Sequence, residues 1–286
     1  MMSEETNEEL SLGFGVIVPV FLWNAVEEIQ RLTKFGRMVD LGFLLGANLS
    51  ALESAFRSCV EDTPEARNGL ELFTSLGEEL QSYAKEQSDA GMPYLRALLT
   101  IRLVIVTETV IQDAVLTSLE SVPGVLEREE VRRIKGPVAE LLAASPAERA
   151  EFFAMALARD GKDHSQSGIG KYERLLQAVG LGGAIDDTVQ RALFELVQVR
   201  NALVHAGGKA DAKFCKSCPS FKLVPGSAIS ITSEMSQRYR VATISFLFEL
   251  MQRWAARRSQ SADLTILRTL SEQAIAKIRG AEASAD

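Results

Sequence analysis

The stretch of residues 184–208, AIDDTVQRALFELVQVRNALVHAGG, carries the clearest structural signal in the chain and predicts a helix over residues 187–206. Asp187 followed three residues later by Gln190 is the pattern of a capping box, which begins a helix. The Gly-Gly pair that closes the stretch is typical of a helix end. His205 therefore falls in the last turn, where the helix dipole favours a protonated imidazole.

Two faces of this predicted helix differ in chemistry. At 100° per residue, one face is an apolar stripe that Arg200 interrupts, and a charge in such a stripe is rare unless it is paired or functional. A second face lies roughly 140° around the helix and mixes an aromatic ring with two amides and an imidazole, as expected of a wet interface or a site. The apolar stripe consists of Val189, Leu193, Leu196 and Leu203, and the second face of Phe194, Gln198, Asn201 and His205.

A second predicted helix, over residues 94–121, carries the opposite charge in a similar position. Glu108 interrupts its apolar face, so both charges are satisfied most simply if Glu108 pairs with Arg200. Removal of Glu108 from a buried pair is expected to cost about 3–5 kcal/mol. The alternative is that either helix rotates enough to expose its charge. The apolar face consists of Ile101, Val104, Ile111, Val115 and Leu119.

The rest of the 286-residue chain also has helical periodicity. With 47% hydrophobic and 24% charged residues, the composition excludes a disordered chain, and short breaks of Gly, Pro and Ser separate the periodic stretches. The sequence predicts an all-α fold, with one small β-hairpin near 214–232 around a Pro-Gly-Ser turn. The break at 88–93 is the best candidate boundary between an N-terminal helical region, 1–90, and a helical domain, 91–286.

Charge and apolar runs favour a cytoplasmic protein. A net charge of −7 disfavours a protein that coats nucleic acid non-specifically. The apolar runs at 10–23 and 98–106 are shorter than the roughly 20 residues that a spanning helix needs, and the acidic N-terminus does not resemble a signal peptide. Three cysteines are too few for a disulfide framework, and the Cys215-x-x-Cys218 pair is interpreted as the hairpin tip.

The residues RNALVH at 200–205 resemble the R-x-x-x-x-H motif of HEPN domains, including the polar residue after the arginine. The flanking sequence agrees with this resemblance, which extends over about residues 95–254. Residues 204–214 resemble the stretch after the motif in the HEPN subfamily associated with RNA-targeting and toxin systems. Residues 170–176 resemble the short helix before the motif helix, and residues 104–119 resemble the first helix of the family.

The resemblance implies a HEPN-like helical bundle and metal-independent RNA cleavage by a homodimer, without a cofactor. The ribose 2′-OH attacks the adjacent phosphorus and leaves a 2′,3′-cyclic phosphate. His205 supplies a group that titrates near neutrality, and Arg200 a cation for the charge on the phosphorane. Asn201 orients either group or binds the phosphate, and Glu108 supports Arg200. The only other histidine, His164, lies in a Gly/Ser-rich loop and is interpreted as solvated.

Lysines that follow the motif make this end of the molecule locally basic. Lys209 and Lys213 are candidate RNA contacts, although a merely solvated loop explains them equally well. The family implies a toxin or anti-phage role, with an antitoxin or defence-system protein as a possible partner. Some toxin members carry a tyrosine two residues after the histidine, which a nucleotidyltransferase antitoxin modifies. Gly207 occupies that position here, so a partner of that kind is not predicted.

Two other functions remain open from the sequence. The first is a non-catalytic HEPN module that binds RNA, a nucleotide or a protein. The second is a helical adaptor whose first 90 residues recruit or sense a partner. An intact Arg, Asn and His at the motif spacing favours the enzyme.

Overall fold

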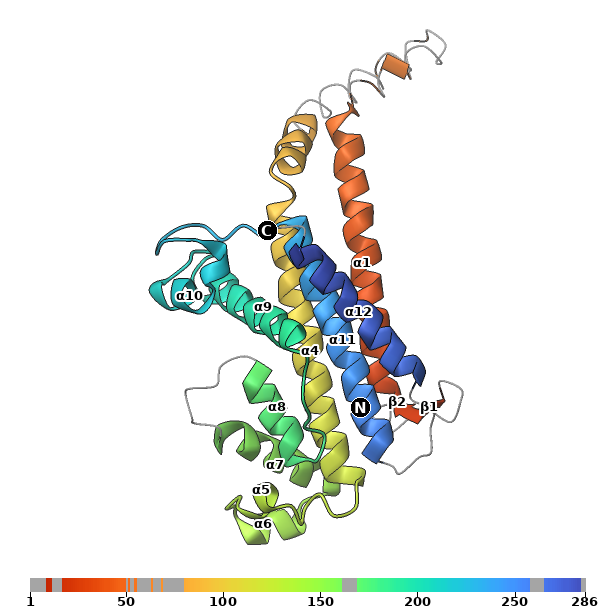
Figure 1. The fold of residues 1–286 in the computed structure, drawn as a ribbon, viewed down its shortest axis with the longest axis vertical. Helices are drawn as coiled ribbons and strands as arrows, with labels where there is room; N and C mark the ends of the chain where they lie inside the picture. The colour runs from red at the N-terminus through yellow and green to blue at the C-terminus, as the bar shows by residue number, and fades with distance from the viewer. Residues whose placement is uncertain are drawn as a thin grey trace. The chain divides into compact units, whose positions relative to one another are not determined.

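The computed structural model describes residues 9–11, 17–49, 51, 54–55, 63, 68, 80–160, 169–257 and 265–283. Helices dominate these residues, so the predicted all-α class is confirmed (Figure 1). His164 and Cys59 lie outside the described residues. Among the residues that the structure describes, no helix is long and apolar enough to cross a membrane.

The chain forms two compact units. The first contains Met1–Ile29, Thr100–Ile229 and Glu234–Asp286, and the second contains Gln30–Leu99 and Ser230–Ser233. The elements in chain order are β1 (Glu9–Ser11), β2 (Ile17–Pro19), α1 (Val20–Ala47), α4 (Pro93–Ser121), α5 (Glu129–Arg132), α6 (Val138–Ala143), α7 (Pro146–Asp160), α8 (Ile169–Ala178), α9 (Asp187–His205), α10 (Ala212–Ser217), the 3₁₀ helix η2 (Pro219–Phe221), α11 (Ser233–Arg257) and α12 (Thr265–Ala283).

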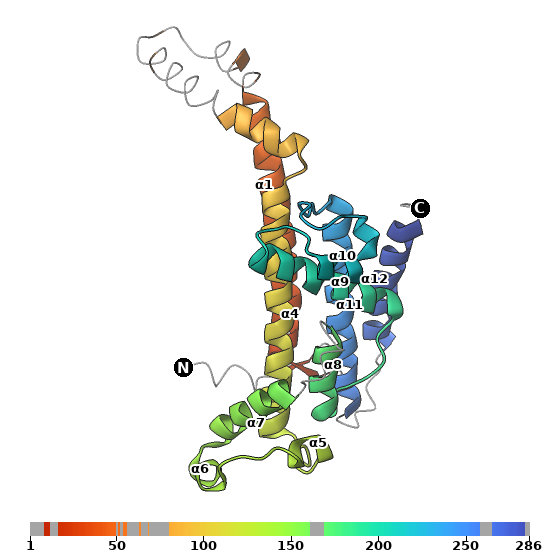
Figure 2. The same ribbon diagram turned by 90° about the vertical axis from the view of Figure 1, so that its left-hand side faces the viewer.

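The core of the first unit is built around α9 and α11. Helix α9 contacts α8, α10 and α12 (Figures 1 and 2). Trp254 of α11 is 2% exposed and meets the ring of Phe21 edge-on at 6.1 Å between centroids. This contact explains why the start of α1 belongs to the first unit, whereas the sequence predicted one N-terminal region up to residue 90. Strands β1 and β2 pair antiparallel, with Leu10 opposite Val18.

The second unit contains the remainder of α1 and residues leading into α4. Gln81 Nε2 donates to the carbonyl oxygen of Ala47 at 3.2 Å, which ties the two segments together. Gly91 and Met92 adopt φ angles of 73° and 56° directly before Pro93, the first residue of α4. The break predicted at 88–93 is therefore a turn between helical segments inside this unit.

Helix α9 matches its predicted extent, with a difference at its start. Asp186 is the N-cap, because its Oδ1 accepts a hydrogen bond from the Thr188 amide at 2.9 Å, so the cap lies one residue earlier than predicted. At the other end the amides of Ala206 and Gly208 both donate to the Ala202 carbonyl at 3.0 Å. Gly207 has a φ of 59° here, a conformation that glycine adopts at low cost.

The β element near 214–232 is smaller than predicted. A single antiparallel bridge joins Lys209 to Ala228, and no strand forms within 214–232. A helix cap and a proline at a helix start explain why this segment forms short helices in place of a hairpin. Asp211 accepts from the Phe214 amide at 2.6 Å and caps α10, and Pro219 begins η2 directly afterwards.

Candidate functional site

The structure brings Glu108 and Arg200 together, as the two interrupted apolar stripes predicted. Arg200 Nη2 of α9 lies 3.6 Å from Glu108 Oε2 of α4. The hydroxyl of Tyr172, on α8, donates to Glu108 Oε1 at 2.6 Å. On the other side, Arg200 Nη1 donates to Asn201 Oδ1 at 3.1 Å. These four residues, which we call the Arg200 cluster, join three helices of the first unit.

The Arg200 cluster is partly open to solvent. The side chains of Arg200 and Glu108 are 25% and 34% exposed, so the pair is less buried than the sequence suggested. Arg200 Nε is buried and has no hydrogen-bond partner among the described residues. A guanidinium carries five N–H groups, and each terminal nitrogen of Arg200 meets one neighbour, so each keeps one N–H for a ligand.

Tyr172 is a member of the cluster that the sequence did not single out. Burial raises the pKa of its phenol above the ordinary range, and the hydrogen bond to Glu108 and the charge of that carboxylate raise it further. Tyr172 therefore stays protonated at neutral pH and holds Glu108 as a donor. A signal was present in the sequence: Tyr172 and Leu176 share one face of α8, and a buried tyrosine needs a partner for its hydroxyl.

His205 is the last residue of α9 and is exposed. It follows Asn201 by four residues, so the two share a face at the helix end. Its imidazole makes no hydrogen bond to the residues that the structure describes. The ring is thus accessible to a substrate or to a second copy of the chain.

Exposed lysines follow this helix end. Lys209 lies in the loop after α9 and Lys213 in α10, and both are exposed. Arg238, another basic residue that follows the motif in the chain, pairs with Glu195 inside the first unit. Lys209 and Lys213 add exposed positive charge to the segment after α9.

The face of α9 that the sequence proposed as a dimer interface is only partly exposed. Gln198 is 6% exposed within the protomer, and Phe194 is half-buried. His205, at the C-terminal end of this face, is exposed, and Asn201 is half-buried like Phe194. A dimer contact through this face would therefore use the helix end rather than the whole stripe.

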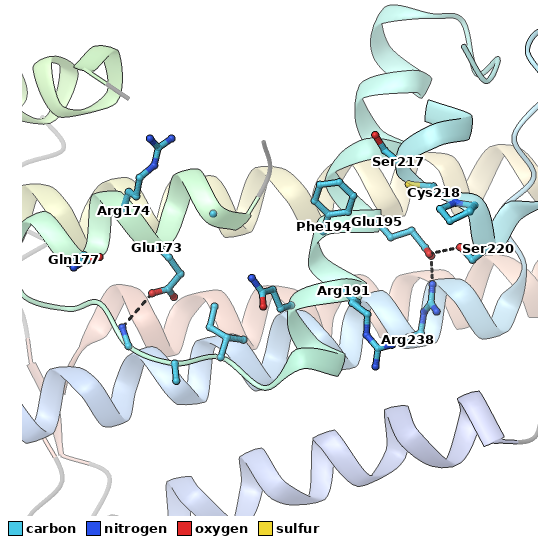
Figure 3. A pocket seen from close by; sticks show the side chains of 16 residues that line it. Glu173, Arg174, Gln177, Arg191, Phe194, Glu195, Ser217, Cys218, Ser220 and Arg238 are labelled. Atoms are coloured by element: carbon cyan, nitrogen blue, oxygen red, sulfur yellow. Dashed lines mark hydrogen bonds and ion pairs between the residues drawn. The ribbon is translucent and has the colours of Figure 1, made fainter. Parts of the chain in front are cut away.

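A second charged cluster, the Glu195 cluster, was not predicted. Glu195 accepts hydrogen bonds from the Ser220 hydroxyl at 2.9 Å and from the Arg238 guanidinium (Figure 3). It also accepts one from the Tyr239 hydroxyl at 2.6 Å. Burial, followed by the charge of Glu195, raises the pKa of Tyr239 above its ordinary range. The sequence signal was weak, because the stripe that Glu195 interrupts consists of small apolar residues, which the structure buries. These are Ala192, Val199 and Ala202.

Cys218 lies beside this second cluster at the end of α10. Burial first, and then the negative charge of Glu195, raises the pKa of its thiol to about 12. Cys215 and Cys218 are both free thiols, and at neutral pH Cys218 stays protonated, which disfavours metal binding and nucleophilic chemistry. Among the described residues there is no group of three or more His, Cys, Asp and Glu that could hold a metal ion.

Comparison with protein-family models, with curated proteins and with solved structures finds no match to this chain.

Proposed function

We propose that this protein is a metal-independent endoribonuclease of the HEPN type, which acts as a homodimer in a toxin or anti-phage role in the cytoplasm. The observation that carries the proposal is the arrangement at the end of α9. An exposed imidazole, His205, follows the guanidinium residue Arg200 by five residues on α9, so the two side chains leave the helix about 140° apart. Glu108 of a neighbouring helix holds the guanidinium in place. The sequence resemblance to the R-x-x-x-x-H motif supplies the reaction.

The reaction needs one proton removed and one supplied. A base takes the proton of the ribose 2′-OH, the 2′-oxygen forms a bond to phosphorus, and the bond from phosphorus to the 5′-oxygen breaks. The departing 5′-oxygen receives a proton, and the products carry a 2′,3′-cyclic phosphate and a 5′-hydroxyl. A histidine suits either proton transfer, because its ordinary pKa is about 6.5.

Arg200 stabilises the additional charge on the phosphorane through its two remaining terminal N–H groups. Glu108 and Asn201 hold the guanidinium from two sides, and Tyr172 holds Glu108. A guanidinium held before the substrate binds needs little reorganisation during the reaction. Lys209 and Lys213 attract the RNA strand toward this end of α9.

A homodimer supplies a second histidine to the site. The described residues offer one exposed histidine at the site, whereas the reaction uses both an acid and a base. Two copies related by a two-fold axis place the same patch on both sides of one cleft, so two His205 side chains would meet there. Light scattering at micromolar concentration should show a dimer. An active monomer would contradict this part of the proposal.

The decisive experiment measures cleavage of single-stranded RNA in EDTA. The wild-type protein should leave 2′,3′-cyclic phosphate ends, and His205→Ala should lose activity by about 10²–10⁴-fold, the usual contribution of acid–base catalysis. The matched control is His164→Ala, which changes the only other histidine and should retain activity. Products with 3′-hydroxyl ends, or full activity of His205→Ala, would exclude the mechanism.

One observation favours a non-catalytic HEPN module instead. Both terminal nitrogens of Arg200 have neighbours within the protomer, as in a purely structural ion pair. Such a module would bind RNA, a nucleotide or a partner protein without cutting RNA. Cells that express His205→Ala would then grow as cells that express the wild-type protein do. Growth arrest that depends on His205 would favour the toxin.

A further inference from the structure

A cavity among the described residues lies away from the Arg200 cluster and has no role in the proposed reaction. Its volume is about 940 Å³, which is within the range of small-molecule and cofactor sites. It lies within the first unit, between α8 and the loop that follows it, the N-terminal half of α9, η2 and the start of α11 (Figure 3). We call it the α8–α9 pocket.

The charged groups of this pocket favour an anion. Its lining holds three arginines and two glutamates. Glu195 pairs with Arg238, which is one of these three arginines, and Glu173 pairs with Arg253 from outside the lining. Glu173 accepts from Arg253 Nη1 at 2.7 Å and from the Gly183 amide at 3.3 Å. Glu195 accepts from Arg238, Tyr239 and Ser220. The carboxylates are therefore occupied.

Two arginines reach the same part of the pocket from different helices. Figure 3 shows the side chains of Arg191, from α9, and Arg238, from α11, on the same side of the pocket. Arg191 is exposed, so its guanidinium can turn toward a ligand. Paired guanidinium groups bind phosphate oxygens bidentately, which a single ammonium does not.

The remaining lining suits a heterocyclic base. Phe194 is half-buried in the pocket wall and offers an apolar ring for stacking. Gln190 is exposed in the same lining one turn before Phe194 on α9, and its amide offers both a donor and an acceptor to the edge of a base. An aromatic ring, an amide and an anion site together match a base joined to a phosphate better than either alone.

We propose that the α8–α9 pocket binds a nucleotide, with the base against Phe194 and the phosphate at Arg191 and Arg238. The nucleotide is either free or one unit of an RNA strand, since the recognised chemistry is the same. Phe194 and His205 are about 16 Å apart along α9 at 1.5 Å per residue, and buried Gln198 lies between them. Binding in the pocket is therefore separable from the chemistry proposed at His205.

The test uses the full-length protein and measures binding rather than cleavage. Isothermal titration with each of AMP, GMP, CMP and UMP should show saturable binding of at least one, with little binding of adenosine alone or inorganic phosphate alone. Arg191→Ala and Phe194→Leu should each weaken that binding by tenfold or more. Phe194→Tyr keeps the ring and should retain it, and Arg268→Ala, an exposed arginine of α12, is the matched control.

A second arm distinguishes the source of the nucleotide. The His205→Ala variant is titrated with a labelled eight-nucleotide single-stranded RNA, with and without Arg191→Ala. If Arg191→Ala weakens RNA binding and no nucleoside monophosphate binds, the ligand is one unit of an RNA strand. If a nucleoside monophosphate binds and Arg191→Ala leaves RNA binding unchanged, the ligand is a free nucleotide. If neither ligand responds to Arg191→Ala or Phe194→Leu while melting curves show an intact fold, the proposal is overturned. Cleavage that continues in these variants would leave the proposed ribonuclease unaffected.

Discussion

Glu195 and Arg200 lie five residues apart on α9, and each pairs with an opposite charge on another helix. The side chains of Glu195 and Arg238 are 11% and 20% exposed, and a direct hydrogen bond joins them. Those of Arg200 and Glu108 are 25% and 34% exposed, and their 3.6 Å separation exceeds hydrogen-bond range. One helix thus carries a closed charged cluster and a more open one.

The difference separates a stabilising role from a functional one. A buried carboxylate must find its partners within the protein, and Glu195 finds three. A guanidinium that reaches solvent and has N–H groups without a partner in the protomer keeps donors for a ligand, as Arg200 does. Substitution of Glu195 should therefore change stability, and substitutions in the Arg200 cluster should change cleavage activity.

The largest stability effect is expected at Glu195. Glu195→Ala should lower the free energy of unfolding by about 3–5 kcal/mol, because Arg238 and the Tyr239 hydroxyl lose their buried acceptor. Glu195→Gln keeps an acceptor oxygen and should cost less. Urea denaturation followed by circular dichroism measures the loss, with Glu129→Ala as the control, since the Glu129 side chain is 73% exposed. A wild-type midpoint for Glu195→Ala would remove the distinction between the clusters.

The opposite pattern is expected at Arg200. Arg200→Lys keeps the charge but loses the planar fork, so RNA cleavage should fall by about 10²–10³-fold. Unfolding should change by about 1 kcal/mol or less, as for other solvent-exposed pairs. Initial rates on single-stranded RNA test this, and Arg102→Lys is the control, because Arg102 pairs with Glu28 at 2.9 Å in the same unit. Equal cleavage rates for both variants would assign Arg200 a structural role.

Glu108 tests how far exposure weakens an ion pair. The sequence predicted a loss of 3–5 kcal/mol on removal of Glu108, but its 34% exposed side chain lowers the expected loss to about 1 kcal/mol. Glu108→Gln still accepts from Tyr172 and should unfold nearly as the wild type does. Glu108→Ala and Glu108→Gln should both slow cleavage, because the guanidinium of Arg200 is less well oriented toward the phosphate. A loss above 3 kcal/mol for Glu108→Ala would mean that this pair is as structural as the other.

Helical periodicity explains which of these features the sequence revealed. A charge inside an apolar stripe is visible within one helix, so the sequence predicts Arg200 and Glu108 as partners, and the structure brings them together. The Glu195 cluster escaped because the stripe around Glu195 consists of small residues, and its partner Arg238 lies 43 positions away. Nothing local identifies that partner.

Long-range packing and short-range capping account for the other differences. The contact between Phe21 and Trp254 joins opposite ends of the chain, which no local pattern predicts. In the segment 214–232, β-prone residues favoured a hairpin, whereas Asp211 as a cap and Pro219 as a helix start produced α10 and η2. Turn and cap chemistry prevailed over strand propensity there.

The smallest expected effect is a pH dependence that compares the two clusters through their tyrosines. Tyr172 and Tyr239 each donate to a carboxylate, Glu108 and Glu195 respectively. In both, burial is the main cause of a raised pKa, and the carboxylate adds to it. An unfolded tyrosine has a pKa of about 10, so the unfolded chain releases these protons at a lower pH than the folded chain.

A phenol whose pKa is higher in the folded state gives stability that is fully present below about pH 10 and is lost as the pH rises beyond it. Thermal unfolding between about pH 8 and 11 should therefore show a melting temperature that falls above pH 10. Tyr239→Phe should reduce that fall more than Tyr172→Phe, because Tyr239 is fully buried and Tyr172 retains some exposure. Tyr94→Phe is the control, since Tyr94 is 69% exposed. Equal slopes for all three variants would show that the closed cluster holds its phenol no more tightly than the open one.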